Sequence, residues 1–248
     1  MLIAWIIGFS LLGSIGALAG AALLLAFPDV TRQRLVPSLI SFASGTLLGA
    51  AFLCMIPAGI RAASVRPVLV TVLIGMVLFF VLEKLVLWRH CHERDCEVHG
   101  QAAPLILIGD ALHNFVDGIV IAAAFLTSVP LGITATIAII AHEIPQEVGD
   151  FAILLDSGLP RARALVLNSL SAAATLPGAV LAYFWLAETS AAMPHILALS
   201  ASSFIYIATA DLIPRLHSGV SLADSTRQTL LLVLGIVTIA VMPATRGF

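Results

Sequence analysis

The feature that most constrains this chain is a series of long apolar runs separated by short clusters of charged residues. Of its 248 residues, 60% are hydrophobic and only 10% are charged, and the mean hydropathy is +1.08. A water-soluble domain spends about 25% of its residues on charge. Because so few charges cannot cover a surface in water, the sequence predicts an integral membrane protein whose side chains mostly face lipid.

The apolar runs have the length of membrane spans. A helix needs about 20 apolar residues to cross a hydrocarbon core of about 30 Å. Eight such runs are bounded by charge, Pro or Gly, and they predict an all-α membrane protein with eight transmembrane helices in a single domain, residues 1–248. The predicted spans are 3–26, 36–60, 67–88, 104–127, 131–155, 162–186, 194–217 and 228–245.

The orientation follows from the 12 Lys and Arg residues, because basic residues are retained on the cytoplasmic side of a membrane. Nine of them flank or follow the first, third, fifth and seventh spans, whereas Arg61, Arg66 and Arg246 lie on the other side. This asymmetry predicts that both termini are extracytoplasmic. We expect a multi-pass protein of the plasma membrane, or of the inner membrane in a bacterium.

Charge and cysteine content exclude other classes of protein. The formal net charge is −2 and the pI is near 6.4, so there is no basic field to bind nucleic acid. Cys54, Cys91 and Cys96 are too few and too unevenly placed for a disulfide framework, and we expect reduced thiols.

Polar residues that could carry chemistry are concentrated in the fourth and fifth predicted spans, which contain no Lys or Arg. They are Asp110, His113, Asn114 and Asp117 in the first of these, and His142, Glu143, Gln146, Glu147 and Asp150 in the second. An ionisable residue at this depth costs several kcal/mol unless it is paired, solvated or neutralised. Five carboxylates without a basic partner therefore predict a bound cation.

The two spans are joined by residues 127–130 alone, which predicts an antiparallel hairpin. Depth in both helices can then be counted from Ser128 at about 1.5 Å per residue. Three pairs of residues lie at equal depth, and we call them level pairs: Asn114 with His142, His113 with Glu143, and Asp110 with Gln146. Imidazole, amide and carboxylate groups of both helices are thus predicted to meet near mid-membrane.

Mixed nitrogen and oxygen ligands suit Zn²⁺, Fe²⁺, Mn²⁺ or Cd²⁺. Ca²⁺ and Mg²⁺ prefer oxygen alone. There are more candidate ligands than one tetrahedral ion requires, so a pair of adjacent ions is an alternative to a single ion. A proton relay of His and acidic residues, or plain packing of polar side chains, could use the same residue types.

A faint internal repeat links the second and seventh predicted spans. Small residues at 44–46 lead into Ile56-Pro57, and small residues at 201–203 lead into Ile213-Pro214. Internal symmetry of this kind is common in transporters, although helix packing alone would also favour small residues.

The motifs HNFVDG at 113–118 and HEIPQE at 142–147 resemble the fourth and fifth helices of the ZIP (Zrt/Irt-like protein) metal transporters. The segment FFVLEK at 79–84 is similar to the end of that family's third helix, and YIATADLIP at 206–214 is similar to its seventh. The predicted span count and outward termini also fit the family.

The resemblance implies a metal site between helices four and five, often binuclear, and movement of a divalent metal, most commonly zinc, toward the cytoplasm. It implies that the ligands are His113, Asn114, Asp117, His142, Glu143 and residue 146, with Glu147 beside them. Two departures concern metal preference: position 146 is Gln where the family branch with the closest motif usually has His, and 175–177 reads TLP where some members place an acid.

Further candidates surround this core. Asp110, Asp150 and Asp211 are predicted pathway residues, Asp211 because it is an acid in an apolar span without an evident basic partner. The predicted cytoplasmic loop supplies His90, Cys91, His92, Cys96 and His99, which could receive exiting metal or could simply be solvated. Small residues on several helices permit a homodimer.

Two other functions use the same residues. His142-Glu143 followed by Gln146 approaches the His-Glu-x-x-His helix of zinc proteases, but the second His is replaced and Pro145 interrupts the turn. A sensor that binds metal without transporting it is the other alternative, and flux into sealed vesicles separates it from a carrier.

Overall fold

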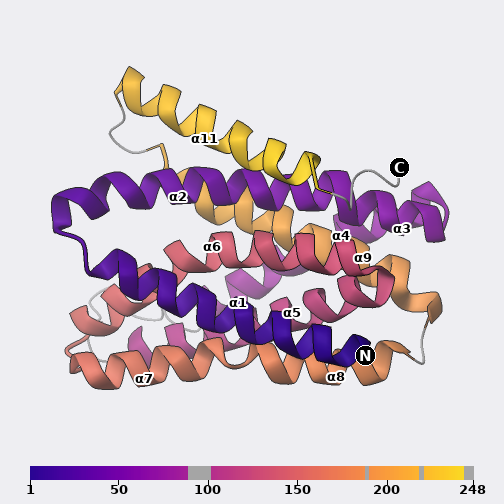
Figure 1. Cartoon of the computed structure of the whole chain (residues 1–248), viewed down its shortest axis with the longest axis horizontal. Coiled ribbons are helices and arrows are strands. Elements are labelled where there is room, and N and C mark those ends of the chain that lie inside the picture. Colours follow the sequence, from indigo (N-terminus) through magenta and orange to yellow (C-terminus); the bar gives the residue numbers. More distant parts are fainter. Residues whose placement is uncertain (89–101, 188–189, 218–220, 243–248) are drawn as a thin grey trace.

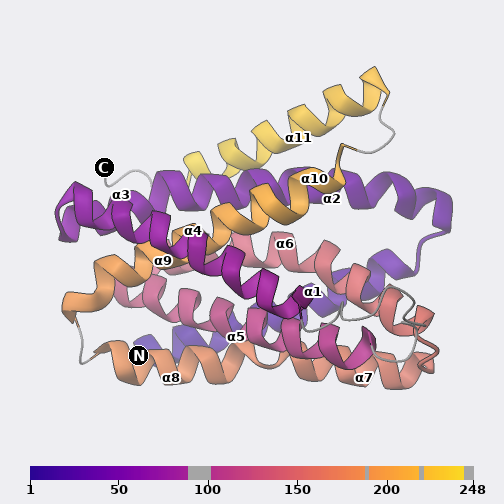
Figure 2. The same ribbon diagram turned by 180° about the vertical axis from the view of Figure 1, so that it is seen from behind.

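The computed structural model describes residues 1–88, 102–187, 190–217 and 221–242, and in this part of the chain all regular structure is helical. The long helices run roughly along one axis (Figures 1 and 2), and α1 begins at the end of the bundle where α11 ends. This arrangement is consistent with a first span that begins, and a last span that ends, on the same side of the membrane.

The elements are α1 (Leu2–Leu25), α2 (Asp29–Ala50), η1 (Ala51–Met55), α3 (Ile56–Ala62), α4 (Val65–Trp88), α5 (Ala102–Thr127), α6 (Val129–Asp156), α7 (Arg161–Ala172), α8 (Thr175–Ala187), η3 (Ser190–Ala192), α9 (Met193–Tyr206), η4 (Ile207–Leu212), α10 (Ile213–Arg215) and α11 (Leu222–Ala240).

Seven helical stretches among the described residues are long and apolar enough to cross a bilayer. They correspond to every predicted span except 131–155. That span falls on α6, a continuous helix of 28 residues. The last predicted span, 228–245, is shifted: α11 already begins at Leu222, because the Ser221 hydroxyl accepts a hydrogen bond from the Asp224 amide and caps the helix in a polar segment.

The second and seventh spans share a local distortion. Each contains a π-helical turn, η1 or η4, immediately before an Ile-Pro pair. The Ile56 amide bonds to the Ala51 carbonyl, five residues back, and the Ile213 amide bonds to Ala208 in the same way. A proline ring collides with the carbonyl four residues earlier in a regular helix, and the wider turn relieves this collision. Both copies of the faint repeat therefore fold alike.

The sixth predicted span is broken into α7 and α8 at residues 173–174. Pro177 has no amide hydrogen for the carbonyl of Ala173 and would clash with it, which explains the break. Past the break, α8 lies directly on α5, because Gly178 contacts the backbone of Phe115 and Gly118 contacts the backbone of Thr175. The absence of side chains at these two glycines permits this close approach.

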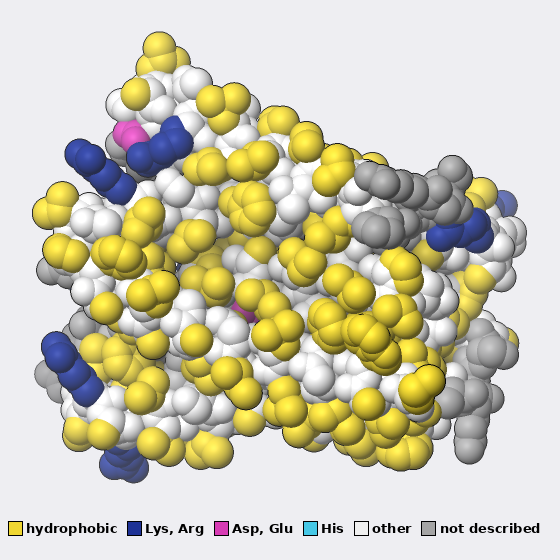
Figure 3. All heavy atoms as spheres, viewed as in Figure 1, with side chains coloured by type: hydrophobic (Ala, Val, Ile, Leu, Met, Phe, Trp, Pro, Cys, Tyr) yellow, Lys and Arg dark blue, Asp and Glu magenta, His cyan; other side chains and the backbone are white. Residues whose placement is uncertain are grey.

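Helix α6 is at the centre of the bundle and packs against α1, α2, α5 and α7. The outer surface is apolar: large side chains such as Leu73, Ile74 and Val77 of α4 and Leu230 of α11 are exposed. In Figure 3 hydrophobic side chains cover most of the visible face, and Lys and Arg lie near the two ends of the long axis. This distribution is what a lipid-embedded helix bundle requires.

The contact between α5 and α8 generates a first prediction. In Gly118→Ala the added Cβ would overlap the Thr175 carbonyl, so the helices must separate. We expect a loss of about 1–3 kcal/mol in unfolding free energy, measured by thermal or denaturant unfolding in detergent. Gly109→Ala is the matched control on the same helix, since nothing lies within 4 Å of its built Cβ. Equal stability of the two variants would contradict the proposed close approach.

Candidate metal centre

The hairpin between α5 and α6 aligns the two polar helices. Ser128 caps α6 by accepting a hydrogen bond from the Leu131 amide, and Pro130 lies in the first helical turn, where its missing amide hydrogen costs nothing. Two of the predicted level pairs are in direct contact. His113 Nε2 lies 3.2 Å from Glu143 Oε1, and Gln146 Nε2 donates to Asp110 Oδ1 at 3.3 Å.

Four side chains, His113, Asp117, His142 and Glu143, converge on one point between the helices. The Nε2 atoms of the two histidines are 3.2 Å apart. His142 Nε2 lies 3.4 Å from both Asp117 Oδ2 and Glu143 Oε1. His113 Nε2 lies 3.9 Å from Asp117 Oδ2. The four atoms all lie within 4.8 Å of one another.

Four of these separations, at 3.2–3.4 Å, are close to those around a tetrahedral zinc ion, and the fifth is 3.9 Å. With metal–ligand bonds of about 2.0–2.1 Å, neighbouring ligand atoms of a tetrahedron are about 3.3–3.4 Å apart. The tautomer of His142 also fits, because its Nδ1 lies 3.1 Å from the Ala138 carbonyl, which can only accept a hydrogen bond. Nδ1 therefore carries a proton, and in the neutral imidazole Nε2 offers its lone pair to a metal.

The carboxylates of this group are buried and poorly satisfied. Asp117, His142 and Glu143 are at most 2% exposed. Beyond the imidazole contacts above, both oxygens of Asp117 and of Glu143 accept no hydrogen bond from the described residues. A buried charge without compensation is costly, and a cation at the point of convergence would remove that cost.

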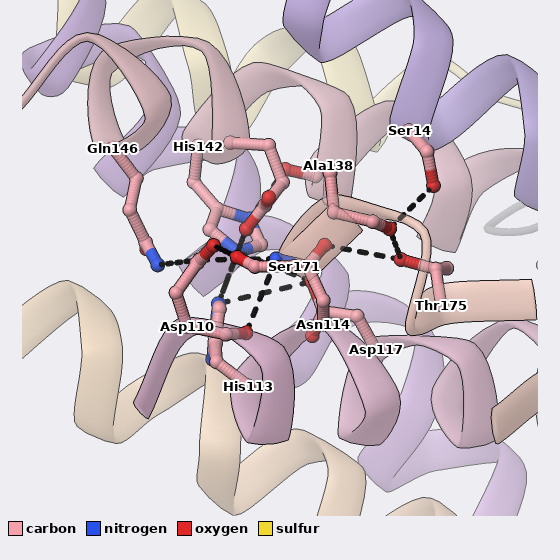
Figure 4. Close-up of polar contacts among 12 residues, drawn as sticks. Ser14, Asp110, His113, Asn114, Asp117, Ala138, His142, Gln146, Ser171 and Thr175 are labelled. Atoms are coloured by element: carbon pink, nitrogen blue, oxygen red, sulfur yellow. Dashed lines mark hydrogen bonds and ion pairs between the residues drawn. The ribbon is translucent and has the colours of Figure 1, made fainter. Parts of the chain in front are cut away.

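A second group of acids, Asp110, Glu143 and Glu147, lies one turn away along the helices and shares Glu143 with the first. The side chain of Asn114 forms its hydrogen bonds with Asp110 and Thr175. Its amide donates to Asp110 Oδ1 at 3.0 Å, and its oxygen accepts from the Thr175 hydroxyl at 3.0 Å. Gln146 also points toward Asp110 (Figure 4), so the two amides act mainly on the second group.

Helix α7 and the start of α8 contribute donors that were not predicted from the sequence. Buried Asn168 donates to Glu147 Oε2, and buried Ser171 donates to Asp110 Oδ2. The Thr175 hydroxyl donates to Asn114 Oδ1. Asn168, Ser171 and Thr175 thus form a polar edge that contacts three residues of the cluster. Residues 168, 171 and 175 are three and four positions apart, as on one face of a helix, and this spacing was the sequence feature that could have predicted the polar edge.

The remaining candidates lie outside these two groups. Asp150 continues the acidic edge of α6 and interacts electrostatically with Asp110 and Glu143. The expectation that Asp211 lacks a basic partner is wrong: Arg215, one helical turn later, donates to its Oδ1 at 2.6 Å. Spacing of four residues on one helix brings the two together. His90, Cys91, His92, Cys96 and His99 lie outside the described residues.

Comparison with known proteins identifies the family. A family model described as ZIP zinc transporter matches residues 88–243, well over half of the chain. The chain belongs to the ZIP family. The matched region includes α5, α6 and α7, and therefore every residue of the two groups, so the resemblance noted in the sequence motifs is confirmed.

Several curated ZIP relatives are similar to this chain. Zinc transporter zipt-7.2 of Caenorhabditis elegans is 37% identical over 139 residues, which is 54% of this chain and 30% of the relative. Metal cation symporter ZIP14 of Mus musculus is 42% identical over 118 residues, 48% of this chain and 24% of the relative. The Drosophila melanogaster ZIP13 homolog is 40% identical over 153 residues, 60% and 43% respectively. The chain thus matches less than half the length of each.

The polar edge of α7 generates a second prediction. Ser171→Ala removes the hydroxyl that donates to Asp110 and leaves this buried carboxylate with fewer donors to orient it. We expect zinc affinity, measured by calorimetry on the purified protein, to fall about tenfold. Ser169→Ala removes a hydroxyl from a neighbouring, partly buried position of α7 and should leave the affinity unchanged. Equal affinities in both variants would assign α7 a packing role only.

Proposed function

We propose that this protein transports divalent transition metal ions, zinc foremost, across a membrane toward the cytoplasm. The observation that carries the proposal is the convergence of two imidazole nitrogens and two carboxylate oxygens at separations suited to tetrahedral zinc, inside a bundle of apolar helices. The curated relatives are named as zinc transporters or metal cation symporters, which supports the same function.

We further propose that α6 is an eighth membrane span. Its 28 residues correspond to about 42 Å of helix, enough to cross a bilayer. Its polar residues lower its hydropathy, but they face the interior of the bundle rather than lipid. Eight spans with extracytoplasmic termini, in the plasma membrane or a bacterial inner membrane, agree with the distribution of basic residues. All four converging ligand atoms come from one chain, so a homodimer is not required.

The ligand set bears on metal choice. Two nitrogens and two oxygens favour Zn²⁺, with Cd²⁺, Fe²⁺ and Mn²⁺ as further substrates, over Ca²⁺ and Mg²⁺. We propose His113, Asp117, His142 and Glu143 as the ligands of the transported ion. The second group offers only oxygen, and its amides from Asn114 and Gln146 are occupied with Asp110. A second ion there would share Glu143 and be held more weakly.

Transport would begin when a metal arriving from outside exchanges its water for these four ligands. The imidazoles must be neutral and the carboxylates ionised to bind it. Movement of one group of helices against another would then open the inner side, where Asp110 and Asp150 lie further along the hairpin toward the cytoplasm. Bound metal neutralises the buried acids, so it lowers the cost of this rearrangement.

The protease alternative is not favoured. A His-Glu-x-x-His zinc site needs a second imidazole at residue 146, whereas Gln146 uses its amide to hold Asp110. Metal sensing without transport would bind zinc at the same residues but show no flux.

Loss of a ligand is the direct test. Glu143→Ala and His113→Ala each remove one of the four converging atoms, and zinc uptake into sealed vesicles containing the purified protein should fall to background. Circular dichroism and gel filtration like those of the unaltered protein would show that both variants fold. Near-normal uptake by both variants would contradict the assignment of these residues as metal ligands. Tight zinc binding by the unaltered protein without any flux would favour a sensor.

Position 146 tests the second group. Gln146→His would place an imidazole beside Asp110, at the depth where the amide now lies, and should tighten zinc binding measured by calorimetry. Gln33→His adds an imidazole at an exposed position of α2 and controls for non-specific binding. Unchanged affinity in Gln146→His would mean that this position does not reach the bound metal.

A further inference from the structure

Arg215 is a basic residue on the inward side of the acidic cluster. It ends α10, directly after the π turn η4 that carries Asp211. Its Nη2 and Nε donate to Asp211 Oδ1 at 2.6 and 3.1 Å, and both side chains are close to half exposed. A half-exposed ion pair contributes little to stability, so stability does not account for it.

The same guanidinium reaches helix α6. A Cβ built on Gly149 would lie 4.0 Å from Arg215 Nη1, so the arginine lies against α6 where that helix has no side chain. The next residue of α6, Asp150, is an acid within electrostatic range of Arg215 and also of Asp110 and Glu143. Asp150 therefore lies in sequence next to the point where Arg215 approaches α6, on the helix that carries the metal-binding groups.

The order along α6 gives this contact a direction. Asp150 follows His142 by eight residues, about 12 Å of helix, toward the end of α6 that leads into Arg161 and Arg163. That end is predicted to be cytoplasmic by its basic residues. A cation that leaves the central group toward this end would pass Asp150 and the level of Gly149, against which Arg215 lies.

We propose that Arg215 is a tethered counter-cation at the inner end of the metal pathway, which competes with the exiting ion for Asp150 and Asp211. The inference rests on the proposed transport function. When no metal is present, the guanidinium neutralises the two acids. An exiting metal displaces the guanidinium from the acids. When the guanidinium returns, it lowers the affinity of the acids for a dication, so the metal is released into the cytoplasm and does not readily bind again.

The first experiment measures inhibition of zinc uptake by zinc enclosed within proteoliposomes. In Arg215→Gln the acids lose their competing cation, and the internal zinc concentration that halves uptake should fall about tenfold. Arg215→Lys keeps the charge and should behave like the unaltered protein. Arg163→Gln removes an exposed basic residue at the same end of the bundle and should change nothing. An Arg215→Gln variant with unaltered inhibition would overturn the proposal.

A second experiment does not depend on transport. Equilibrium dialysis of the purified full chain against zinc should show one more bound ion in Arg215→Gln than in the unaltered protein, and the combined Arg215→Gln, Asp150→Asn variant should lose it. An equal number of ions in all three proteins would refute the role of Arg215. Vesicles with the unaltered protein that take up no zinc would refute the transport proposal instead, and the dialysis would still decide the role of Arg215.

Discussion

The arrangement of this protein depends on the cost of holding carboxylates inside an apolar helix bundle. Asp110, Asp117, Glu143 and Glu147 are all buried, and neither α5 nor α6 contains a Lys or Arg to pair with them. Such groups are stable only when hydrogen bonds or a counter-charge replace water. Donors from neighbouring helices satisfy Asp110 and one oxygen of Glu147, and one oxygen each of Asp117 and Glu143 lies beside the imidazoles. This is the electrostatic setting in which a divalent cation stabilises the bundle.

Several helices of the bundle depart from regular geometry at prolines. The π turns before Pro57 and Pro214 and the break before Pro177 each free carbonyl groups that a regular helix would have bonded. At the break, the Ala172 carbonyl accepts hydrogen bonds from Ser14 and Thr175. Beyond it, the glycine contact between α5 and α8 brings Thr175 within reach of Asn114. The break between α7 and α8 thus lies where Thr175 reaches the cluster.

Charge changes stepwise along α6. The first group combines the imidazoles of His113 and His142 with two carboxylates. The second group contains only acids, of which Asp110 accepts hydrogen bonds from amides and a hydroxyl. The acidic edge of α6 then ends at Asp150, within electrostatic range of Arg215. A dication moving inward would meet ligands of decreasing softness and then the positive charge of Arg215, which competes with it for the acids. Binding strong enough to capture the ion at the centre is therefore compatible with release at the inner end.

The sequence by itself determined the membrane class and the two helices on which the polar residues converge, because both follow from local composition and from one short turn. Apolar runs predict spans wherever they occur, and counting from Ser128 paired His113 with Glu143 and Asp110 with Gln146, which are in contact. Imidazole and carboxylate groups that meet between two membrane helices are typical of a cation site, since an ion offsets the cost of their burial.

Only the tertiary structure decided which groups lie beside this hairpin. Asn168, Ser171 and Thr175 are neutral residues in an apolar run, where they are equally consistent with helix packing, and only the approach of α7 and α8 makes them donors to the cluster. The position of Arg215 against Gly149 depends on how the seventh span crosses α6. Periodicity within one helix cannot encode such contacts, because they depend on the crossing of helices far apart in the chain.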